Sequence, residues 1–300
     1  MNCTLRVATA RRSLIVKQGR PWVEKYPQIA APADRTRVEA AFYAVAERCA
    51  RVGGAMPRLL DADDEARVLV LEDAGAAGDF TGLYAGATLG EGDCAALAEY
   101  LLALHACALR PPELELFVNR DMRTLNHEHI FALPLREANG LPLDAITPGL
   151  QAAADALKCD RAYGERVEAL GRRYLADGDV LVHGDFYPGS WLRAGPVASG
   201  FSRTGSGTGV AVIDPEFCFI GCSEFDFGVM LGHLMLAGQP PARMAQLEAA
   251  VPRGCDLPLI RRFAGVEIMR RLIGVAQLPL AASLENKQRL LERSHAMVLS

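Results

Sequence analysis

Two short apolar runs, each followed by acidic residues, constrain this chain more than any other feature. The first, Val180–His183, leads into Gly184 and Asp185, and the second, Val210–Ile213, leads into Asp214-Pro-Glu216. Apolar runs of this length, bounded by turn-forming Gly and Pro, indicate short buried strands. The sequence therefore predicts two strands that each end in a turn bearing carboxylates.

This pair of acidic turns suits phosphoryl transfer from a nucleotide. Asp185 can orient an acceptor hydroxyl and take its proton, while Asp214 and Glu216 can hold Mg²⁺ against phosphates. Residues i and i+2 project to the same side of an extended chain, so both acids of Asp-Pro-Glu are expected to face one ion. A capped turn is the alternative for Asp-Pro-Glu taken alone. We expect His183 to brace the loop through a backbone hydrogen bond.

A lysine and a glutamate near the N-terminus extend the same interpretation. Lys17 lies in the apolar strand Ser13–Gln18, and Glu39 lies on the helix predicted over 34–51. Kinases use a strand lysine paired with a helix glutamate to grip nucleotide phosphates. A lysine that snorkels from an edge strand is the alternative. The backbone of Glu72, Asp73 and Ala74, after the predicted strand Val68–Glu72, could recognise an adenine edge.

The order of predicted elements indicates the α+β class. We expect residues 1–72 to form a small β-rich lobe, 73–79 a hinge, and 80–300 a larger helical lobe that carries the two acidic turns. Besides the strands above, the small lobe has expected strands at 4–8 and 58–61. Further helices are expected over 95–109, 142–157, 161–175, 227–237, 241–249, 257–277 and 283–299. The Gly- and Ser-rich stretch 194–209 is expected to be a hairpin connection.

The composition restricts the classes of molecule that this protein is expected to bind. The 300 residues include 32 basic and 36 acidic ones, which gives a net charge of −4 and no basic field for nucleic acid. The longest apolar runs, such as Val229–Ala237, are too short to span a bilayer, and no signal peptide is visible. Eight scattered cysteines without a secretion signal predict reduced thiols in a cytoplasmic protein. We therefore expect a small-molecule partner, and neither nucleic acid nor membrane; the sequence leaves a homodimer open.

Several motifs together resemble one known family. The segments His183-Gly-Asp185 with Ser190, Ile213-Asp-Pro-Glu-Phe217 and Glu224-Phe-Asp226-Phe-Gly228 resemble the methylthioribose kinases, within the aminoglycoside phosphotransferase and protein-kinase-like family. The likeness extends over almost the whole chain, to the segments 13–18, 126–131, 147–149 and 267–274. The resemblance implies a bilobal protein-kinase-like fold, ATP and Mg²⁺ as cofactors, and phosphorylation of a hydroxyl of 5-methylthioribose.

The resemblance also implies a role for each matching residue. Lys17, paired with Glu39, would bind ATP phosphate, and Glu72, Asp73 and Ala74 would form the hinge. Asp185 would be the catalytic base that contacts the sugar hydroxyl, with Asp214 and Glu216 as magnesium ligands. Ser190 stands where related kinases place a metal-binding Asn. Arg270 and Arg271 resemble a twin-arginine element for substrate and phosphate. Adjacent helix residues point about 100° apart, so we expect these guanidiniums to serve two partners.

One part of the family pattern is not found. The family has a Gly-rich phosphate loop just before the strand that matches Asn2–Val7, and this chain begins inside that strand. We therefore expect an N-lobe truncated at its start and weak ATP binding. Two alternatives stay open: a kinase for another small alcohol, such as an aminoglycoside, an amino alcohol or another pentose, and a catalytically weak pseudokinase used as a binding module. The presence of Lys17, Asp185, Asp214 and Glu216 disfavours the second.

Overall fold

The computed structural model describes residues 2–10, 12–24, 26–75, 77–193 and 209–300. The chain divides into two compact units. Unit 1 contains Met1–Phe80, Glu99–Arg123 and Asp179–Ile220, and unit 2 contains Thr81–Ala98, Thr124–Gly178 and Gly221–Ser300. The predicted hinge at 73–79 lies just before the first boundary between the units, which follows Phe80. Residue 76 of this hinge and residues 194–208 of the predicted connection lie outside the described residues. The division into lobes at 72 and 80 stays a prediction.

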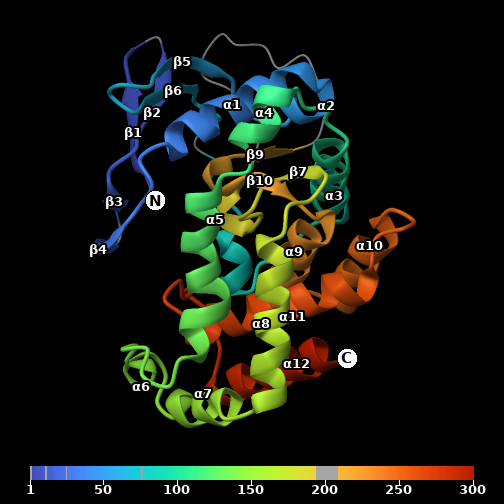
Figure 1. Cartoon of the computed structure of the whole chain (residues 1–300). Coiled ribbons are helices and arrows are strands. Elements are labelled where there is room, and N and C mark those ends of the chain that lie inside the picture. Colours follow the sequence, from blue (N-terminus) through green and yellow to red (C-terminus); the bar gives the residue numbers. More distant parts are fainter. Residues whose placement is uncertain (1, 11, 25, 76, 194–208) are drawn as a thin grey trace. The chain divides into compact units, whose positions relative to one another are not determined.

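Unit 1 contains an antiparallel sheet of four strands in the order β1-β2-β6-β5 (Figure 1). These strands are β1 (Cys3–Ala8), β2 (Ser13–Gln18), β5 (Leu59–Asp63) and β6 (Val68–Glu72). The register places Lys17 between Thr4 of β1 and Leu69 of β6. A strand with neighbours on both sides is held at both edges, so the sheet fixes the backbone that carries Lys17.

Helix α1 (Arg35–Arg48) packs its apolar stripe against this sheet. Val38, Phe42 and Val45 are buried at helical spacing, as the sequence predicts. Two charged residues of the same face, Arg35 and Glu39, are also fully buried. The predicted helix 34–51 is interrupted at residue 49, after which α2 (Ala50–Gly53) begins. A buried charge needs a partner, so this face of α1 carries polar contacts as well as core packing.

The two strands predicted before the acidic turns are present. They are β7 (Val180–Val182), which pairs with β10 (Phe219–Gly221), and β9 (Val210–Val212), which pairs with β8 (Trp191–Arg193). The ladder between β8 and β9 sets Trp191 opposite Val212, and the amide of Ile213 donates to the carbonyl of Ser190 at 2.9 Å. The turn that follows Asp185 is thus fixed to the strand that precedes Asp214. A separate two-stranded ribbon consists of β3 (Trp22–Val23) and β4 (Tyr26–Ala30).

Two buried helices form the centre of unit 2. Helix α9 (Ser223–Leu236) packs along α11 (Leu257–Ile273), and α12 (Leu284–Leu299) covers α11. Gly228 allows the close approach, because a Cβ atom built there would lie 2.5 Å from Cβ of Phe263. The remaining α-helices of the described residues are α3 (Glu91–His105), α4 (Pro111–Leu116), α5 (Arg120–His127), α6 (Leu143–Ile146), α7 (Leu150–Lys158), α8 (Arg161–Leu175) and α10 (Pro241–Ala250). A small sheet followed by many helices is the α+β pattern expected from the sequence.

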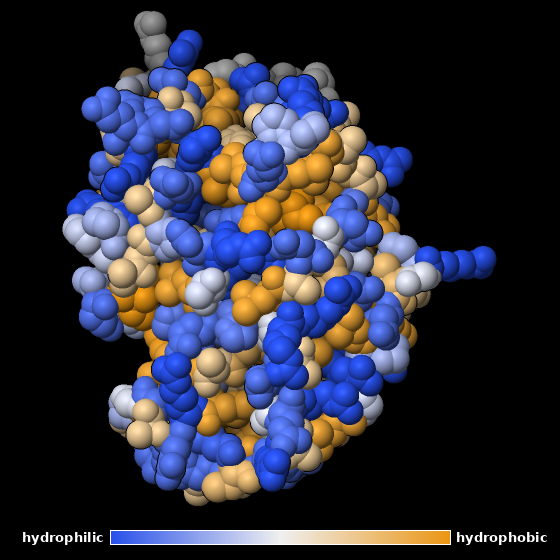
Figure 2. Space-filling view, viewed as in Figure 1, coloured by the Kyte–Doolittle hydropathy of each residue, from blue (hydrophilic) through white to orange (hydrophobic). Residues whose placement is uncertain are grey.

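Short helical turns complete the backbone. They are the 3₁₀ turns η1 (Thr81–Ala85), η3 (Leu133–Leu135), η4 (Pro188–Ser190) and η5 (Pro215–Phe217), and the π-helical turn η2 (Glu128–Ala132). Within the described ranges, no helix combines the length and apolar character needed to cross a membrane. Figure 2 shows hydrophilic and hydrophobic residues interspersed over the viewed face.

One pair of cysteines differs from the expectation that all eight are reduced thiols. Cys49, which follows α1, and Cys107, which follows α3, form a disulfide with Cα atoms 6.2 Å apart. Among the described residues, the cysteines outside a disulfide are Cys3, Cys94, Cys159, Cys218, Cys222 and Cys255. The prediction of reduced thiols throughout is wrong for the pair, because residues 58 positions apart are brought together by the fold alone. The cytoplasmic location stays a prediction.

Candidate active site

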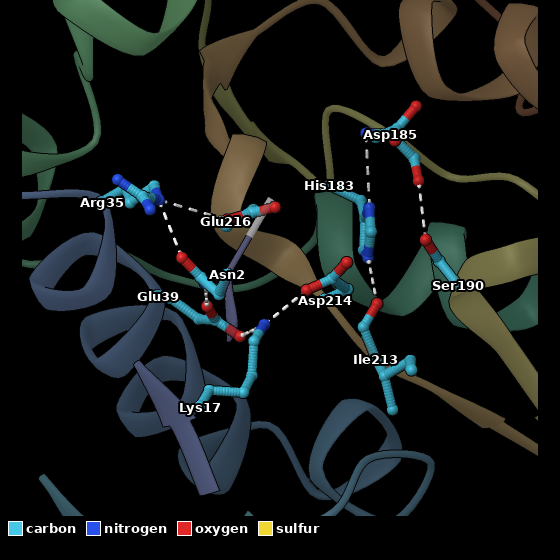
Figure 3. A network of polar contacts seen from close by, with 10 residues as sticks. All are labelled: Asn2, Lys17, Arg35, Glu39, His183, Asp185, Ser190, Ile213, Asp214 and Glu216. Atoms are coloured by element: carbon cyan, nitrogen blue, oxygen red, sulfur yellow. Dashed lines mark hydrogen bonds and ion pairs between the residues drawn. The ribbon is translucent and has the colours of Figure 1, made fainter. Parts of the chain in front are cut away.

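A buried lysine connects two acidic groups in unit 1. The Nζ atom of Lys17 lies 2.6 Å from Oε1 of Glu39 and also contacts the carboxylate of Asp214 (Figure 3). Lys17 is 5% exposed and Glu39 is fully buried, whereas the Asp214 side chain is 38% exposed. The predicted pairing of the strand lysine with the helix glutamate is therefore present. Asp214 adds a second, more open carboxylate to it.

Burial and charge together set the protonation of these groups. Burial alone lowers the pKa of Lys17, but Asp214 and Glu39 outweigh it and hold that pKa well above its usual value. Burial raises the pKa of Glu39 to about 7 against the opposing effect of Lys17. Burial also acts to raise the pKa of Asp214, yet the Lys17 ammonium lowers it to about 2. At neutral pH, Lys17 is cationic and Asp214 is anionic.

The two acids of the Asp-Pro-Glu segment point to different partners. Asp214 adopts the left-handed region, with φ 68° and ψ 48°, and residues 215–217 continue as the 3₁₀ turn η5. Asp tolerates this conformation better than most residues. Glu216 is fully buried, and its Oε2 atom lies 3.6 Å from Nε of Arg35 (Figure 3). The backbone at Asp214 is not extended, so the alternation assumed for the two acids does not apply there, and their shared role as magnesium ligands stays a prediction.

The loop that carries Asp185 is fixed by hydrogen bonds. His183 donates from Nε2 to the carbonyl of Ile213 at 3.0 Å, and its Nδ1 atom accepts from the amide of Asp185 at 3.4 Å (Figure 3). This arrangement requires the neutral Nε2–H tautomer. The Ser190 hydroxyl donates to the carbonyl of Asp185 at 3.1 Å and is buried. His183 thus braces the loop as predicted, and Ser190 contacts the Asp185 backbone.

Gly184 is required by the same loop. Its φ is 84°, and a Cβ atom built there would lie 2.1 Å from the carbonyl oxygen of Phe217. No side chain can be accommodated against a backbone atom at that distance. The Asp185 loop and the turn η5 therefore approach each other closely at this point.

A cavity of about 410 Å³ adjoins the lysine. Among the residues that line it are Lys17, Asp214 and the predicted hinge residues Glu72, Asp73 and Ala74. Of the other predicted residues in unit 1, Glu39, Asp185, Ser190 and Glu216 are not part of the lining. The structure thus joins the predicted hinge and the predicted phosphate-binding lysine in one pocket.

Sequence reasoning missed Arg6, which also lines this pocket. Its guanidinium donates to Oδ1 of Asp73 at 3.0 Å and to the carbonyl of Gly75 at 2.8 Å, and Nε lies 2.9 Å from Oδ2 of Asp73. Burial opposes ionisation of Asp73, but hydrogen bonds from its neighbours, with the charge of Arg6, lower the pKa of Asp73. The sequence does not indicate this pairing, because Arg6 on β1 and Asp73 in the predicted hinge are 67 residues apart.

The residues of this pocket fit a magnesium ion shared with a nucleotide. Across the described residues there is no group of three or more His, Cys, Asp or Glu side chains that could hold a metal. Magnesium at nucleotide sites needs only one or two carboxylates, because phosphate oxygens and waters supply the other ligands. Asp214 is ionised, partly exposed and part of the pocket wall. It fits this description by itself.

The predicted substrate residues Arg270 and Arg271 lie in unit 2, on α11. Glu267 contacts Nε of Arg270, and its Oε1 atom lies 2.8 Å from Nε of Arg271. One carboxylate thus contacts both guanidiniums, because residues three and four apart on a helix are neighbours. Nη1 of Arg271 also donates to the carbonyl of Ala276 at 3.3 Å. The role of the two arginines toward substrate and phosphate stays a prediction. Although burial opposes it, the two arginines hold the pKa of Glu267 well below its usual value.

A histidine and a tyrosine extend this cluster. Nε2 of His233 lies 2.7 Å from Oε1 of Glu267, and the Tyr84 hydroxyl lies 2.6 Å from Nδ1 of His233. Burial lowers the pKa of His233 to about 4, against the opposing effect of Glu267. His233 is therefore neutral at pH 7. The helix spacing of Glu267 to the two arginines was a signal that sequence reasoning could have used.

Known proteins resemble the chain in sequence and in fold. Methylthioribose kinase from Exiguobacterium sibiricum is 32% identical over 124 residues, which is 41% of this chain and 28% of that protein. Methylthioribose kinase from Geobacillus kaustophilus is 27% identical over 221 residues, which is 61% of this chain and 51% of that protein. The chain thus spans about half, or less, of the length of these relatives.

A solved structure has the same fold. Spectinomycin phosphotransferase, crystallised with ADP and spectinomycin, aligns with a TM-score of 0.55 at 12% identity, covering 100% of this chain and 89% of that one. At this identity the likeness concerns the fold alone, and it confirms the expected α+β, protein-kinase-like class. The sequence pattern of the phosphotransferase enzyme family matches residues 4–266, which is most of the chain. The chain therefore belongs to the phosphotransferase enzyme family.

Proposed function

We propose that this protein transfers the γ-phosphate of ATP to a hydroxyl of a small sugar-like molecule. The observation that carries the proposal is the convergence of Lys17, Asp214 and the hinge residues on one cavity of unit 1. A cation and an ionised carboxylate at a pocket wall are what the phosphates and the metal of a nucleotide require. The family supports the same class of reaction.

Each residue of unit 1 then has a defined task. Lys17, held by Glu39, binds phosphate oxygens, and the backbone at 72–74 contacts the adenine edge. Asp214 would hold Mg²⁺, which when bound neutralises charge on the phosphates. Asp185 accepts the proton of the acceptor hydroxyl, because it stands on a braced loop joined to the Asp214 strand. Ser190 keeps the Asp185 backbone in place.

The acceptor we propose first is 5-methylthioribose, which would place the protein in methionine salvage. Relatives named methylthioribose kinase support this choice, and the matched regions cover 28% and 51% of their length. By the resemblance to these relatives, Arg270 and Arg271 would bind the substrate and its phosphate. Another small alcohol, such as an aminoglycoside, an amino alcohol or a different pentose, is the second candidate, since the solved structure that shares the fold contains spectinomycin.

A substrate panel tests this proposal. The purified protein is incubated with Mg²⁺ and ATP and with 5-methylthioribose, ribose, choline, spectinomycin or an aminoglycoside, and ADP release is followed by a coupled assay. We expect release above the background hydrolysis rate with 5-methylthioribose. Release of ADP with another alcohol only would change the assigned substrate and would still support a small-molecule kinase. Nucleotide binding without release from any acceptor would instead support the pseudokinase.

A further inference from the structure

We propose that Arg6, held in place by Asp73, binds the base of the nucleotide: its guanidinium forms one wall of the end of the cavity that receives this base. The proposal rests on the proposed function, because it takes the cavity of unit 1 to be the nucleotide site. It adds a residue that determines how tightly the nucleoside part is bound and that does not act on the phosphates.

The register of the sheet divides the cavity into two ends. Thr4 of β1 lies opposite Lys17 of β2, and both line the cavity. In a second row, Arg6 of β1 lies opposite Ile15, and Ile15 lies opposite Leu71 of β6. These three residues line the cavity as well. Residues two apart on a strand project to the same face about 6–7 Å from each other, so the row of Arg6 is separate from the row of Lys17.

The end of the cavity at Arg6 suits a flat aromatic ring. Ile15 and Leu71 give it an apolar wall on the sheet. Leu71 is followed directly by the predicted hinge, and Leu192, which also lines the cavity, is joined to Asp79 of that hinge by a β-bridge. Small-molecule sites are built from such apolar walls with a few polar groups that fix the orientation of the ligand. The base and the phosphates would therefore occupy different ends of one cavity.

A forked contact with Asp73 fixes Arg6 at this end. Nη2 of Arg6 donates to Oδ1 of Asp73 at 3.0 Å and to the carbonyl of Gly75 at 2.8 Å, while Nε lies 2.9 Å from Oδ2 of Asp73. The Asp73 side chain is 5% exposed and that of Arg6 is 46% exposed. Asp73 thus holds the guanidinium, and Arg6 stays accessible to a ligand. A planar guanidinium stacks on aromatic rings, and a lysine ammonium lacks this plane.

Two other roles for Arg6 lead to different expectations. An exposed ion pair that only supports the fold contributes little to stability, and its loss does not distinguish one ligand from another. An arginine that binds phosphate would matter for ligands that contain phosphate and not for adenosine. A base-binding arginine is needed for adenosine and for ADP alike, and it leaves the binding of inorganic tripolyphosphate unchanged.

Calorimetry with three probes tests the proposal. ADP, adenosine and inorganic tripolyphosphate are each titrated in EDTA into wild type, R6M and R6K. The control is R12M, because Arg12 is an exposed arginine between β1 and β2 that is not part of the cavity lining. We expect R6M to bind ADP and adenosine about three- to tenfold more weakly, by one common factor, and tripolyphosphate within about twofold of wild type. R6K should resemble R6M, and R12M should resemble wild type.

The role of Asp73 as a positioning residue is tested by a double-mutant cycle. D73N keeps the shape of the side chain and removes the charge that holds Arg6, so it should show part of the loss of adenosine affinity seen in R6M. The double variant R6M/D73N should bind adenosine no more weakly than R6M, because the two residues act through one contact. The Tm of R6M should stay within about 3 °C of wild type, since the ion pair is partly exposed.

Two results would overturn the proposal. One is an R6M protein that binds adenosine as tightly as wild type, and the other is a loss of tripolyphosphate affinity in R6M as large as its loss of adenosine affinity. Should R6M fail to fold, R6K and D73N serve for the same comparison. A wild-type protein that binds neither ADP nor adenosine would refute the proposed function, and this proposal with it. Equal binding of both probes by wild type and R6M would refute this proposal alone.

Discussion

Nε2 of His183 donates a hydrogen bond to the carbonyl oxygen of Ile213 at 3.0 Å, and this single contact ties the loop of Asp185 to the strand that ends at Asp214. The ladder contact between Ile213 and Ser190 repeats the connection on the other side of the loop. The proposed base and the proposed metal ligand therefore hold a set separation. Variants of the two acids should give different defects, because the acids perform different steps.

Replacing Asp185 with Asn should remove the proton acceptor while the nucleotide pocket stays intact. We expect D185N to reduce kcat by about 10²–10⁴-fold, the usual contribution of a general base. ADP affinity, measured by calorimetry, should stay within about twofold of wild type. D179N, an exposed acid just before β7, is the matched control and should keep wild-type turnover. Turnover of D185N within threefold of wild type would contradict the role.

Replacing Asp214 should weaken ATP only when magnesium is present. D214N removes the carboxylate that lines the pocket, so phosphate charge is neutralised less well in the metal complex. We expect a loss of about tenfold or more in affinity for ATP with Mg²⁺, which corresponds to about 1.4 kcal/mol or more. With EDTA the affinity should change little. Equal affinities of D214N and wild type in Mg²⁺ would show that Asp214 serves only to hold Lys17.

Two glycine variants should have opposite effects on stability. G184A places a Cβ atom 2.1 Å from the carbonyl of Phe217 at a φ of 84°, so we expect it to lower the free energy of unfolding by about 3 kcal/mol or more. G164A adds a Cβ atom in open space on α8 and should raise that free energy by about 0.5–1 kcal/mol. Urea unfolding measures both. A neutral G184A would mean that the two turns can separate.

Unfolding should become easier below pH 6.5 because of His233. Its pKa is about 4 in the fold and 6.5 when solvated, so between these values the unfolded chain binds a proton that the folded chain does not. Stability is therefore complete above about pH 6.5 and is lost as pH falls toward 4, by on the order of 3 kcal/mol. Urea unfolding at pH 7.5 and 4.5 should show a smaller difference in H233Q than in wild type, and H105Q should retain the full difference.

The sequence predicts those helices and strands whose apolar residues recur with a clear period. Helix α1 and strands β2 and β6 were found because their apolar residues repeat at the expected spacing. The helix expected over 95–109 is α3, which spans Glu91–His105, and Pro111 then begins α4. Proline is accepted at the first helical position, where no backbone donor is required.

The sequence predicts those residues of the candidate site whose chemical type alone indicates a role. Lys17 and Glu39 pair as their residue types suggested, whereas the contact of Lys17 with Asp214 was not predicted. Arg35 was not found, because its partner Glu216 lies far along the chain and only the fold brings the two together. The reasoning for Glu216 assumed an extended strand, whereas Asp214 lies in the left-handed region and residues 215–217 form a 3₁₀ turn. Backbone conformation at a single turn cannot be inferred from apolar periodicity.

Lys17 and Asp214 are 197 residues apart, and this distance has a consequence for synthesis. Unit 1 is completed only by its last segment, Asp179–Ile220, although it begins at the N-terminus. Chains emerge from the ribosome N-terminus first and domains fold as units. The sheet and α1 therefore wait, with Glu39 as the available carboxylate for Lys17, until more than two-thirds of the chain has been translated. A fragment that stops before residue 214 would contain Lys17 without the Asp214 carboxylate, and its unit 1 would be incomplete.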